Sequence, residues 1–386
     1  MGSSRSSNEV ARMEGDVVII GAGLIGLALA RELAQRGASV RVLDTGEPGH
    51  AASWAAAGML APSSEGLDGS FYELCSASLE RYPAFAAELH AQTGLDVHLR
   101  REGFVSPAYD DAGLEFIEAR AAEARARGLH ARMLTTAQTL QLEPALAPVR
   151  AAVFFEHEAS VDNRRLGRAL RAAVECAGVR VDEGLPWVRV AATQRRVNGV
   201  ETAQGFISAP VVVNAAGAWA GGIEGVPEHA RVPVEPVKGQ MLALAMPANL
   251  VRHTIYARHG TYLVPRDDGR LLVGATGERV GFDTRVTAAG VQRLLERALR
   301  IAPGLKDLAL VETWAGLRPG TPDSLPYLGA GALEGYFLAT GHLRNGVLLT
   351  PITAELVADA IEGRTPRISL APYAPERVRA ASNVAS

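Results

Sequence analysis

The chain has 386 residues, 48% of them hydrophobic, which is enough to bury a large core and to form two or three domains. With 42 acidic and 39 basic residues the formal net charge is −3, which excludes a global charge bias toward nucleic acid. The two cysteines, Cys75 and Cys176, match neither a metal-binding spacing nor a disulfide framework, so we expect a reducing, cytoplasmic location.

Both ends of the chain are polar. Residues 1–14 lack the apolar core of a signal peptide and are predicted to be disordered, as a native leader or as a segment added to the natural chain. Residues 373–386, rich in alanine, arginine and serine, are predicted to form a second disordered tail.

A dinucleotide-binding motif follows the N-terminal tail. VVII (17–20) is typical of a strand buried on both faces of a parallel sheet, and the glycines after it exclude a membrane span. The turn G-x-G-x-x-G then places Gly21 for a tight turn, Gly23 for close approach of a pyrophosphate, and Gly26 for close helix packing. A second strand ends in Asp44, which is placed to bind a ribose diol; the alternative is a helix cap or a solvated turn.

Two stretches rich in small residues favour FAD over NAD as the ligand. AASWAAAGMLAP (51–62) and APVVVNAAGAWA (209–220) let the backbone approach a large planar group; the alternatives are a tightly packed loop and an ordinary strand ending in a glycine turn. A second G-x-G-x-x-G is missing, so we expect no separate NAD(P)H site.

The rest of the chain alternates helical and antiparallel patterns. Residues 163–177 are predicted to form a helix that ends at Gly178. An antiparallel meander is expected over 187–214 with its turn at Asn198 and Gly199, and a hairpin turn is expected at Asp268 and Gly269. Alternating stretches between 231 and 315 indicate an antiparallel sheet, and a final helix is expected over 347–361.

WAGLRPGTPDSLPYLG (314–329) holds one arginine among apolar and turn-forming residues. A partly buried cation needs an anionic partner, because desolvation is costly otherwise. The residues alone leave two candidates for Arg318: an internal acid such as Asp323 or Glu312, or a carboxylate carried by a ligand.

Together, the glycine turn, ASWAAAGMLAP, VVVNAAGAW, WAGLRPGTPDSLPYLG and TGHLRNGVLLTPIT resemble the flavin amine oxidases of the D-amino acid oxidase superfamily. Within it, residues 15–368 are most similar to the glycine oxidases of thiamine biosynthesis. The resemblance implies an α/β fold with a Rossmann-like FAD-binding domain (15–92, 151–225 and 316–368). A mainly antiparallel substrate-binding domain (93–150 and 226–315) and a homotetramer are also implied.

The resemblance implies three substrate-binding residues. Arg318 would pair with the substrate carboxylate, Tyr262 would hydrogen-bond the same group, and Arg344 would lie over the mouth of the site. On sequence alone Tyr262 is an ordinary strand aromatic and Arg344 a residue that fixes its loop. The implied FAD-binding residues are Gly21, Gly23, Gly26, Asp44, Ser53, Ala56, Gly58, Met59, Ala216, Gly217, Trp219, Gly341, His342, Arg344, Asn345, Gly346, Val347 and Leu348.

The implied reaction oxidises glycine or another small amine to its imine, with hydride transfer to the flavin and oxygen as acceptor. No general base is expected, His342 included, and no metal. No cysteine follows Cys176, so FAD is expected to bind non-covalently. A dehydrogenase of D-amino acids or sarcosine that reduces a quinone, and a flavoprotein acting on modified tRNA, remain as alternatives.

Overall fold

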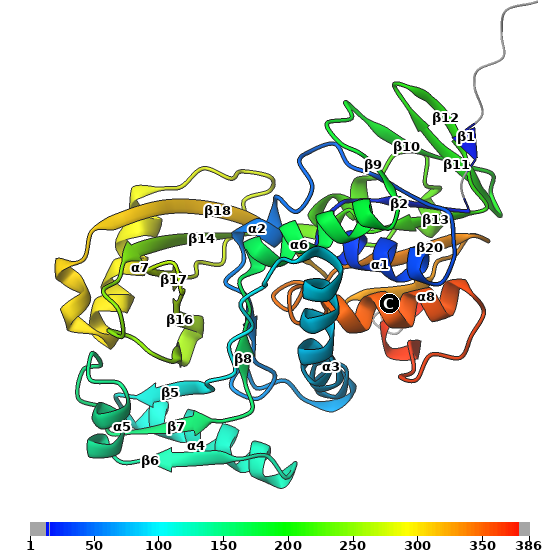
Figure 1. Cartoon of the computed structure of the whole chain (residues 1–386). Helices are drawn as coiled ribbons and strands as arrows, with labels where there is room; N and C mark the ends of the chain where they lie inside the picture. The colour runs from blue at the N-terminus through cyan, green and yellow to red at the C-terminus, as the bar shows by residue number, and fades with distance from the viewer. Residues whose placement is uncertain (1–12, 15, 378–386) are drawn as a thin grey trace, which may run out of the picture.

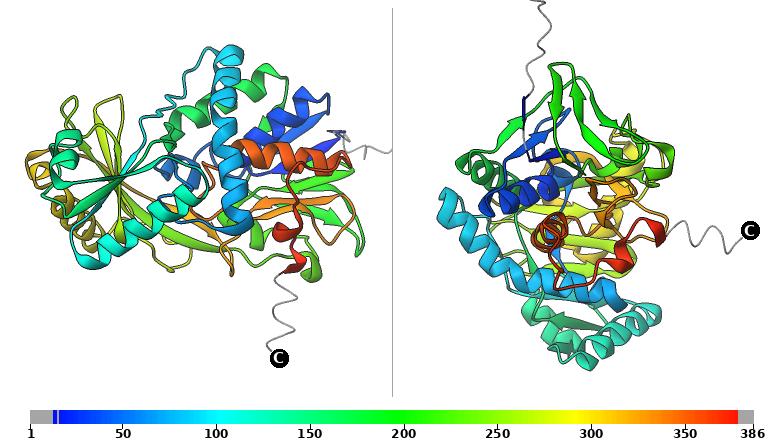
Figure 2. Two further views of the ribbon diagram at one scale, coloured as in Figure 1. Left: turned by 90° about the horizontal axis from the view of Figure 1, so that it is seen from below. Right: turned by 90° about the vertical axis from the view of Figure 1, so that its right-hand side faces the viewer.

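The computed structural model describes residues 13–14 and 16–377 (Figure 1). Its two main sheets lie in opposite halves of the molecule, a division that the view from below also shows (Figure 2). No helix in this part of the chain is both long and apolar enough to cross a membrane.

The first main sheet has six strands and is parallel except at one edge, where β19 and β20 are antiparallel. In spatial order its strands are β19 (Tyr327–Ala330), β20 (Tyr336–Thr340), β13 (Val211–Asn214), β2 (Val17–Ile20), β3 (Val40–Leu43) and β9 (Arg180–Asp182). All four residues of β2 are buried, as the β-branched run predicts.

Helices cover one face of this sheet and a smaller sheet covers the other. The helices are α1 (Leu24–Gln35), α3 (Gly69–Thr93), α6 (Asn163–Cys176) and α8 (Thr350–Ile361), which pack on one another through a shared hydrophobic core. The smaller sheet consists of β1 (Met13–Glu14), β12 (Gly205–Ser208), β11 (Val197–Thr202) and β10 (Val188–Ala192). Its apolar side chains share a core with Val18, Ile20 and Val212.

The second main sheet has eight strands, all antiparallel except for the pair β15–β5. In spatial order they are β18 (Leu310–Gly320), β14 (Glu235–Ala245), β17 (Arg270–Gly274), β16 (Thr261–Pro265), β15 (Thr254–Ala257), β5 (Phe104–Ala108), β7 (Ala151–Phe155) and β6 (Ala131–Leu134). Helices α4 (Asp111–Ala126), α5 (Thr136–Leu142) and α7 (Ala288–Ile301) pack on it. The predicted combination of a parallel and a mainly antiparallel sheet is confirmed.

Several short elements complete the two halves. They are α2 (Ala52–Ala55), β4 (Met59–Leu60) paired with β8 (Ala159–Ser160), and the 3-10 turns η1 (Gly217–Gly222), η2 (Glu228–Ala230), η3 (Arg258–Gly260), η4 (Pro303–Asp307) and η5 (Ala371–Tyr373). Strand β7 pairs with β5 and β6, so residues 151–155 lie in the eight-stranded sheet and not with the predicted FAD-binding part. The other domain boundaries stay predictions.

Two turn predictions have different outcomes. The hairpin turn at Asp268 and Gly269 is confirmed, since it joins β16 to β17 and Gly269 has a φ of +82°. The turn at Asn198 and Gly199 is wrong, because both residues lie inside β11 and the chain reverses over 193–196. A side chain at Gly199 would lie 2.0 Å from the Ile207 carbonyl oxygen, so the glycine allows β11 and β12 to lie close together at this point.

The predictions for the helices and tails also differ in outcome. Helix α6 begins at its predicted residue and ends one residue early, at Cys176, whereas α8 begins at Thr350, three residues after the predicted start. Most of the predicted tails lie outside the described residues. Where they are described the prediction is wrong: residues 13–14 form β1, and Tyr373 is buried with its hydroxyl donating to the Ser70 carbonyl.

Candidate active site

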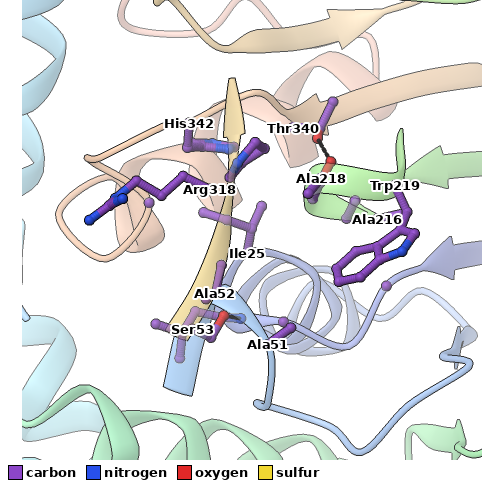
Figure 3. Close-up of a pocket in the computed structure, with 18 of the residues that line it drawn as sticks. Ile25, Ala51, Ala52, Ser53, Ala216, Ala218, Trp219, Arg318, Thr340 and His342 are labelled. Carbon is purple, nitrogen blue, oxygen red and sulfur yellow. Dashed lines mark hydrogen bonds between the residues drawn. The ribbon is translucent and has the colours of Figure 1, made fainter. Parts of the chain in front are cut away.

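A cavity of about 840 Å³ lies between the carboxyl ends of β2 and β13 and one face of the eight-stranded sheet. This is within the size range of cofactor and ligand pockets, roughly 300–1,000 Å³. The first half of the molecule lines it with residues 20–25, the loop after β3, η1 and the loop after β20. The second half contributes Gly239, Met241, Tyr262, Gly316 and Arg318. Figure 3 shows Arg318 and His342 at one end and Trp219 across from them.

The glycine turn has the geometry that a nucleotide cradle needs. Gly21 has a φ of +110°, and an added side chain would lie 2.4 Å from the Ala215 carbonyl oxygen. A side chain at Gly26 would lie 1.9 Å from the Gly21 carbonyl oxygen, so this residue lets α1 pack against the turn and does not line the cavity. Gly23 faces the cavity, and a side chain there would approach only Ser53 Oγ, at 3.2 Å. The residues present therefore fit a pyrophosphate at the start of α1.

Asp44 holds the turn together and also lines the cavity. Its carboxylate accepts the Ala22 N–H at 2.6 Å and the Gly46 N–H at 2.7 Å. These hydrogen bonds fix two turns and do not cap α1, whose N-terminus has no side-chain cap, so the helix-cap alternative is wrong. Since each oxygen keeps a free lone pair, the ribose interaction stays a prediction.

The loop of residues 51–59 lines the cavity with the predicted small residues and is fixed by a buried arginine. Ser53, Ala56, Gly58 and Met59 all face the cavity. Arg266 Nη2, from the end of β16, donates to the Ala57 carbonyl at 2.8 Å and to Asn163 Oδ1 at 3.0 Å. Asn163 in turn donates to the carbonyls of Ser53 and Trp54. This network holds the loop in place from the opposite sheet.

The turn after β13 and the loop after β20 complete the long part of the cavity. Ala216, Gly217 and Trp219 line it, and Thr340 Oγ1 donates to the Gly217 carbonyl at 3.1 Å (Figure 3). Of the predicted residues in the second loop, the cavity is lined by His342, Arg344, Gly346 and Val347 but not by Gly341, Asn345 and Leu348.

His342 is a poor general base here. Burial lowers the pKa of its imidazole to about 3, and Nε2 lies 3.1 Å from Thr353 Oγ1 on α8. It is therefore neutral near pH 7 and fixes the loop to α8.

Arg318 reaches the cavity from β18 without forming an ion pair in the described chain. Its Nη1 donates to the Thr276 carbonyl at 3.2 Å, and no carboxylate of the described chain forms an ion pair with it. Both predicted internal partners are engaged elsewhere: Glu312 binds Arg164 through two 3.0 Å contacts, and Asp323 binds Arg377 at 2.7 Å. Neither of these two acids is therefore the partner of Arg318.

Tyr262 and two glycines shape the space around Arg318. A side chain at Gly239 would lie 2.1 Å from Arg318 Nη1, and one at Gly274 would lie 2.3 Å from the Tyr262 ring. The Tyr262 hydroxyl donates to Met241 Sδ at 3.0 Å. Burial raises the pKa of Tyr262, while Arg318 and Arg344 oppose that shift, so the phenol stays protonated beside both cations.

Arg344 has partners of its own. Its Nη2 donates to the Tyr256 hydroxyl at 3.0 Å and lies 3.7 Å from Glu65 Oε1. Burial raises the pKa of Glu65, and Arg344 and then Arg318 oppose this shift. Glu65 and Tyr256 escaped the sequence analysis, because SSEG (63–66) has the composition of a solvated turn and Tyr256 that of a core strand residue.

The chain was compared with known proteins. It is 41% identical over 355 residues to the bifunctional protein ThiO/ThiG of Trichormus variabilis, and the match covers 90% of this chain but only 53% of that protein. The chain thus spans about half the length of such curated relatives. It is also 36% identical over 364 residues to the glycine oxidase of Geobacillus kaustophilus, covering 93% of this chain and 96% of that one.

Solved structures agree with these sequence matches. The crystal structure of the Geobacillus kaustophilus glycine oxidase superimposes with a TM-score of 0.89, covering 95% of this chain and 99% of that one. That of an iminodiacetate oxidase from Chelativorans has a TM-score of 0.85 at 30% identity, covering 93% of this chain and 98% of that one. The family model for FAD dependent oxidoreductases matches residues 16–360. The resemblance seen in the sequence motifs is confirmed: the chain belongs to the family of FAD dependent oxidoreductases.

Proposed function

We propose that the protein is an FAD-dependent oxidase of glycine and other small amines, with non-covalently bound FAD. The observation that carries this proposal is Arg318, a guanidinium that faces the cavity beside a nucleotide cradle and has no carboxylate partner in the described chain. An amino acid would bring the missing anion. The glycine oxidases among the relatives support the choice of substrate.

The residues around the substrate end would bind and orient rather than transfer protons. The fork of Arg318 can hold a carboxylate through two parallel hydrogen bonds, which fixes orientation as well as charge. Tyr262, buried beside it, can donate a further hydrogen bond to the same group. With the carboxylate held, the amine and the α-carbon would face the inner part of the cavity.

The cofactor would supply the redox chemistry, accepting a hydride from the α-carbon and passing the electrons on to oxygen. The protein would align the C–H bond and exclude water. Gly346 and Val347 line the cavity ahead of α8, whose N-terminal end offers positive potential there. Glycine, oxygen and water would give glyoxylate, ammonia and hydrogen peroxide, with the imine released first.

Further parts of the proposal rest on the resemblance. We place the enzyme in the cytoplasm as a homo-oligomer, a tetramer. Its imine product would there feed thiazole synthesis for thiamine. Neither Cys75, buried in α3, nor Cys176, exposed at the end of α6, lines the cavity, which supports non-covalent FAD.

Peroxide release tests the proposal. Purified protein is assayed with glycine, sarcosine, D-alanine and D-proline under air, and under nitrogen with a dye as electron acceptor. We expect peroxide from glycine under air. Dye reduction without peroxide would favour a dehydrogenase, and inactivity toward all four amines would contradict the proposal.

A further inference from the structure

Three charged side chains line the end of the cavity where Arg318 lies, which we call the substrate end. Only two of the three form an ion pair with each other. Arg318 and Arg344 supply two positive charges and Glu65 one negative charge. Glu65 Oε1 lies 3.7 Å from Arg344 Nη2, and no carboxylate of the described chain comes as close to Arg318. The site therefore presents one guanidinium free for an anion and one that is already neutralised.

Glu65 is buried on an anchored loop. Its side chain is only 7% exposed, whereas that of Arg344 is 44% exposed. The backbone N–H groups of the two preceding residues, Ser63 and Ser64, both donate to Glu158 Oε1, at 2.8 and 2.7 Å. Burial of the side chain and this anchoring of the loop keep the Glu65 carboxylate beside Arg344.

We propose that Glu65 is a specificity-determining residue, which neutralises Arg344 and thereby restricts the site to amines that carry a single acidic group. This inference rests on the proposed function for the placement of the first carboxylate at Arg318. A ligand with a second carboxylate would have to bring it to Arg344, where it meets Glu65. Like charges brought together in an enclosed site are strongly unfavourable and serve to reject wrong ligands.

Replacing Glu65 by glutamine should reverse this preference. The amide keeps the shape of the side chain but removes the charge, so Arg344 becomes free to bind a second carboxylate. A neutral or zwitterionic ligand with one carboxylate should bind about as before, because Arg318 is unchanged. A role in stability alone would weaken both classes of ligand together.

The test uses two ethers that cannot be oxidised and that differ by one carboxylate, methoxyacetate and diglycolate. Each is titrated at pH 8.5 into FAD-loaded protein, and the Kd is read from the change in flavin absorbance. We expect the wild type to prefer methoxyacetate. In Glu65→Gln the ratio of the two Kd values should shift toward diglycolate by about tenfold or more. Sarcosine and iminodiacetate, which differ in the same way, should show the same shift in kcat/KM.

Two further variants make the result specific. Glu158→Gln changes a buried carboxyl that accepts the Ser63 and Ser64 N–H groups, but Glu158 does not line the cavity, so its Kd ratio should equal that of the wild type. In the double variant Glu65→Gln/Arg344→Gln the gain for diglycolate should disappear. An unchanged ratio in Glu65→Gln, or a gain that persists without Arg344, would overturn the inference. Because these Kd values require no turnover, they are independent of whether glycine is oxidised.

Discussion

At the scale of single residues, substitution of Arg318 should affect substrate binding but not the stability of the fold. Its guanidinium has no carboxylate partner in the described chain, so removing it leaves no internal acid unpaired. In Arg318→Gln a bound substrate carboxylate loses its partner, which costs about 3–5 kcal/mol. The value of kcat/KM for glycine should fall by about two to four powers of ten, while the melting temperature of the substrate-free enzyme stays within about 2 °C.

Arg377 offers a matched control for this prediction. It binds Asp323 and the Leu325 carbonyl, and none of these three residues lines the cavity, so Arg377→Gln should lower the melting temperature and leave kcat/KM nearly unchanged. Arg318→Lys should recover part of the activity, because an ammonium keeps the charge but not the fork. An Arg318 variant that melts much lower yet keeps normal kinetics would show that the residue holds the fold.

The glycines of the nucleotide turn allow a second prediction at this scale. Gly23→Val should fold but lose FAD binding, since the new side chain enters the cavity and approaches only Ser53 Oγ. Gly26→Ala should instead impair folding, because its side chain would lie 1.9 Å from a backbone oxygen. Circular dichroism and titration with FAD distinguish the two results. Near-normal FAD affinity in folded Gly23→Val would contradict the assignment of the cradle.

Single residues also mark where the sequence stops being informative. The glycine turn, Arg318 and the small-residue loops could be predicted, because each depends on local backbone demands or on a motif. Glu65 could not, because its importance comes from Arg344, 279 positions away, and only the fold brings the two together. For Arg318 the sequence left the anionic partner open. Only the structure shows that Glu312 and Asp323 form ion pairs with other arginines.

At the scale of elements, the unit β2–α1–β3 followed from sequence, since β2 is a continuous apolar run, the turn after it is glycine-rich, and α1 has apolar residues at helical spacing. The turn at Asn198 and Gly199 did not, because a glycine required for close strand approach carries the same local signal as a hairpin glycine. The pairing of β7 with β5 and β6 likewise depends on tertiary structure, and no local sequence pattern specifies it.

Glu158, which accepts two N–H groups of the loop between β4 and α3, should make the stability of the protein depend on pH. Burial raises the pKa of this carboxyl to about 8, although the Ser63 and Ser64 N–H groups oppose the shift, and Oε2 has no hydrogen-bond partner in the described chain. Between its ordinary pKa of 4.5 and about 8, the unfolded chain has lost this proton while the folded chain keeps it. The free energy of unfolding therefore falls as the pH rises through this window.

Glu158→Gln removes that dependence, because an amide does not titrate and its oxygen can still accept both N–H groups. Relative to the wild type, the variant should gain stability steadily from pH 5 to pH 8, on the order of a few kcal/mol. Urea unfolding of both proteins at the same pH cancels the opposite contribution of His342, whose pKa is lowered by burial. A difference that is independent of pH would contradict the assigned shift.

At the scale of the whole molecule, the cavity is the place where the two sheets meet. Gly23 and Gly217 line it from the first half, Gly239 and Arg318 from the second, and Arg266 ties the cradle loop to β16. A cofactor bound there contacts both halves at once. Its binding should therefore stabilise the packing of one half on the other as well as the nucleotide cradle itself.

Thermal unfolding of the apoprotein tests this coupling. A ligand that binds only the folded state at 100 times its Kd adds about 2.7 kcal/mol to the free energy of unfolding, so FAD should raise the melting temperature by several degrees in a concentration-dependent way. FMN lacks the adenylate half that would contact the glycine turn and Asp44, so it should raise the melting temperature much less at the same concentration. Methoxyacetate should add a further increase when FAD is present and little when it is absent, since the flavin would close one wall of the substrate end. Equal stabilisation by FMN and FAD would show that the glycine turn makes no contribution to binding.

Acid precipitation of the holoprotein tests whether FAD is bound non-covalently. Non-covalent FAD should remain in the supernatant, and flavin fluorescence in the pellet would contradict that assignment.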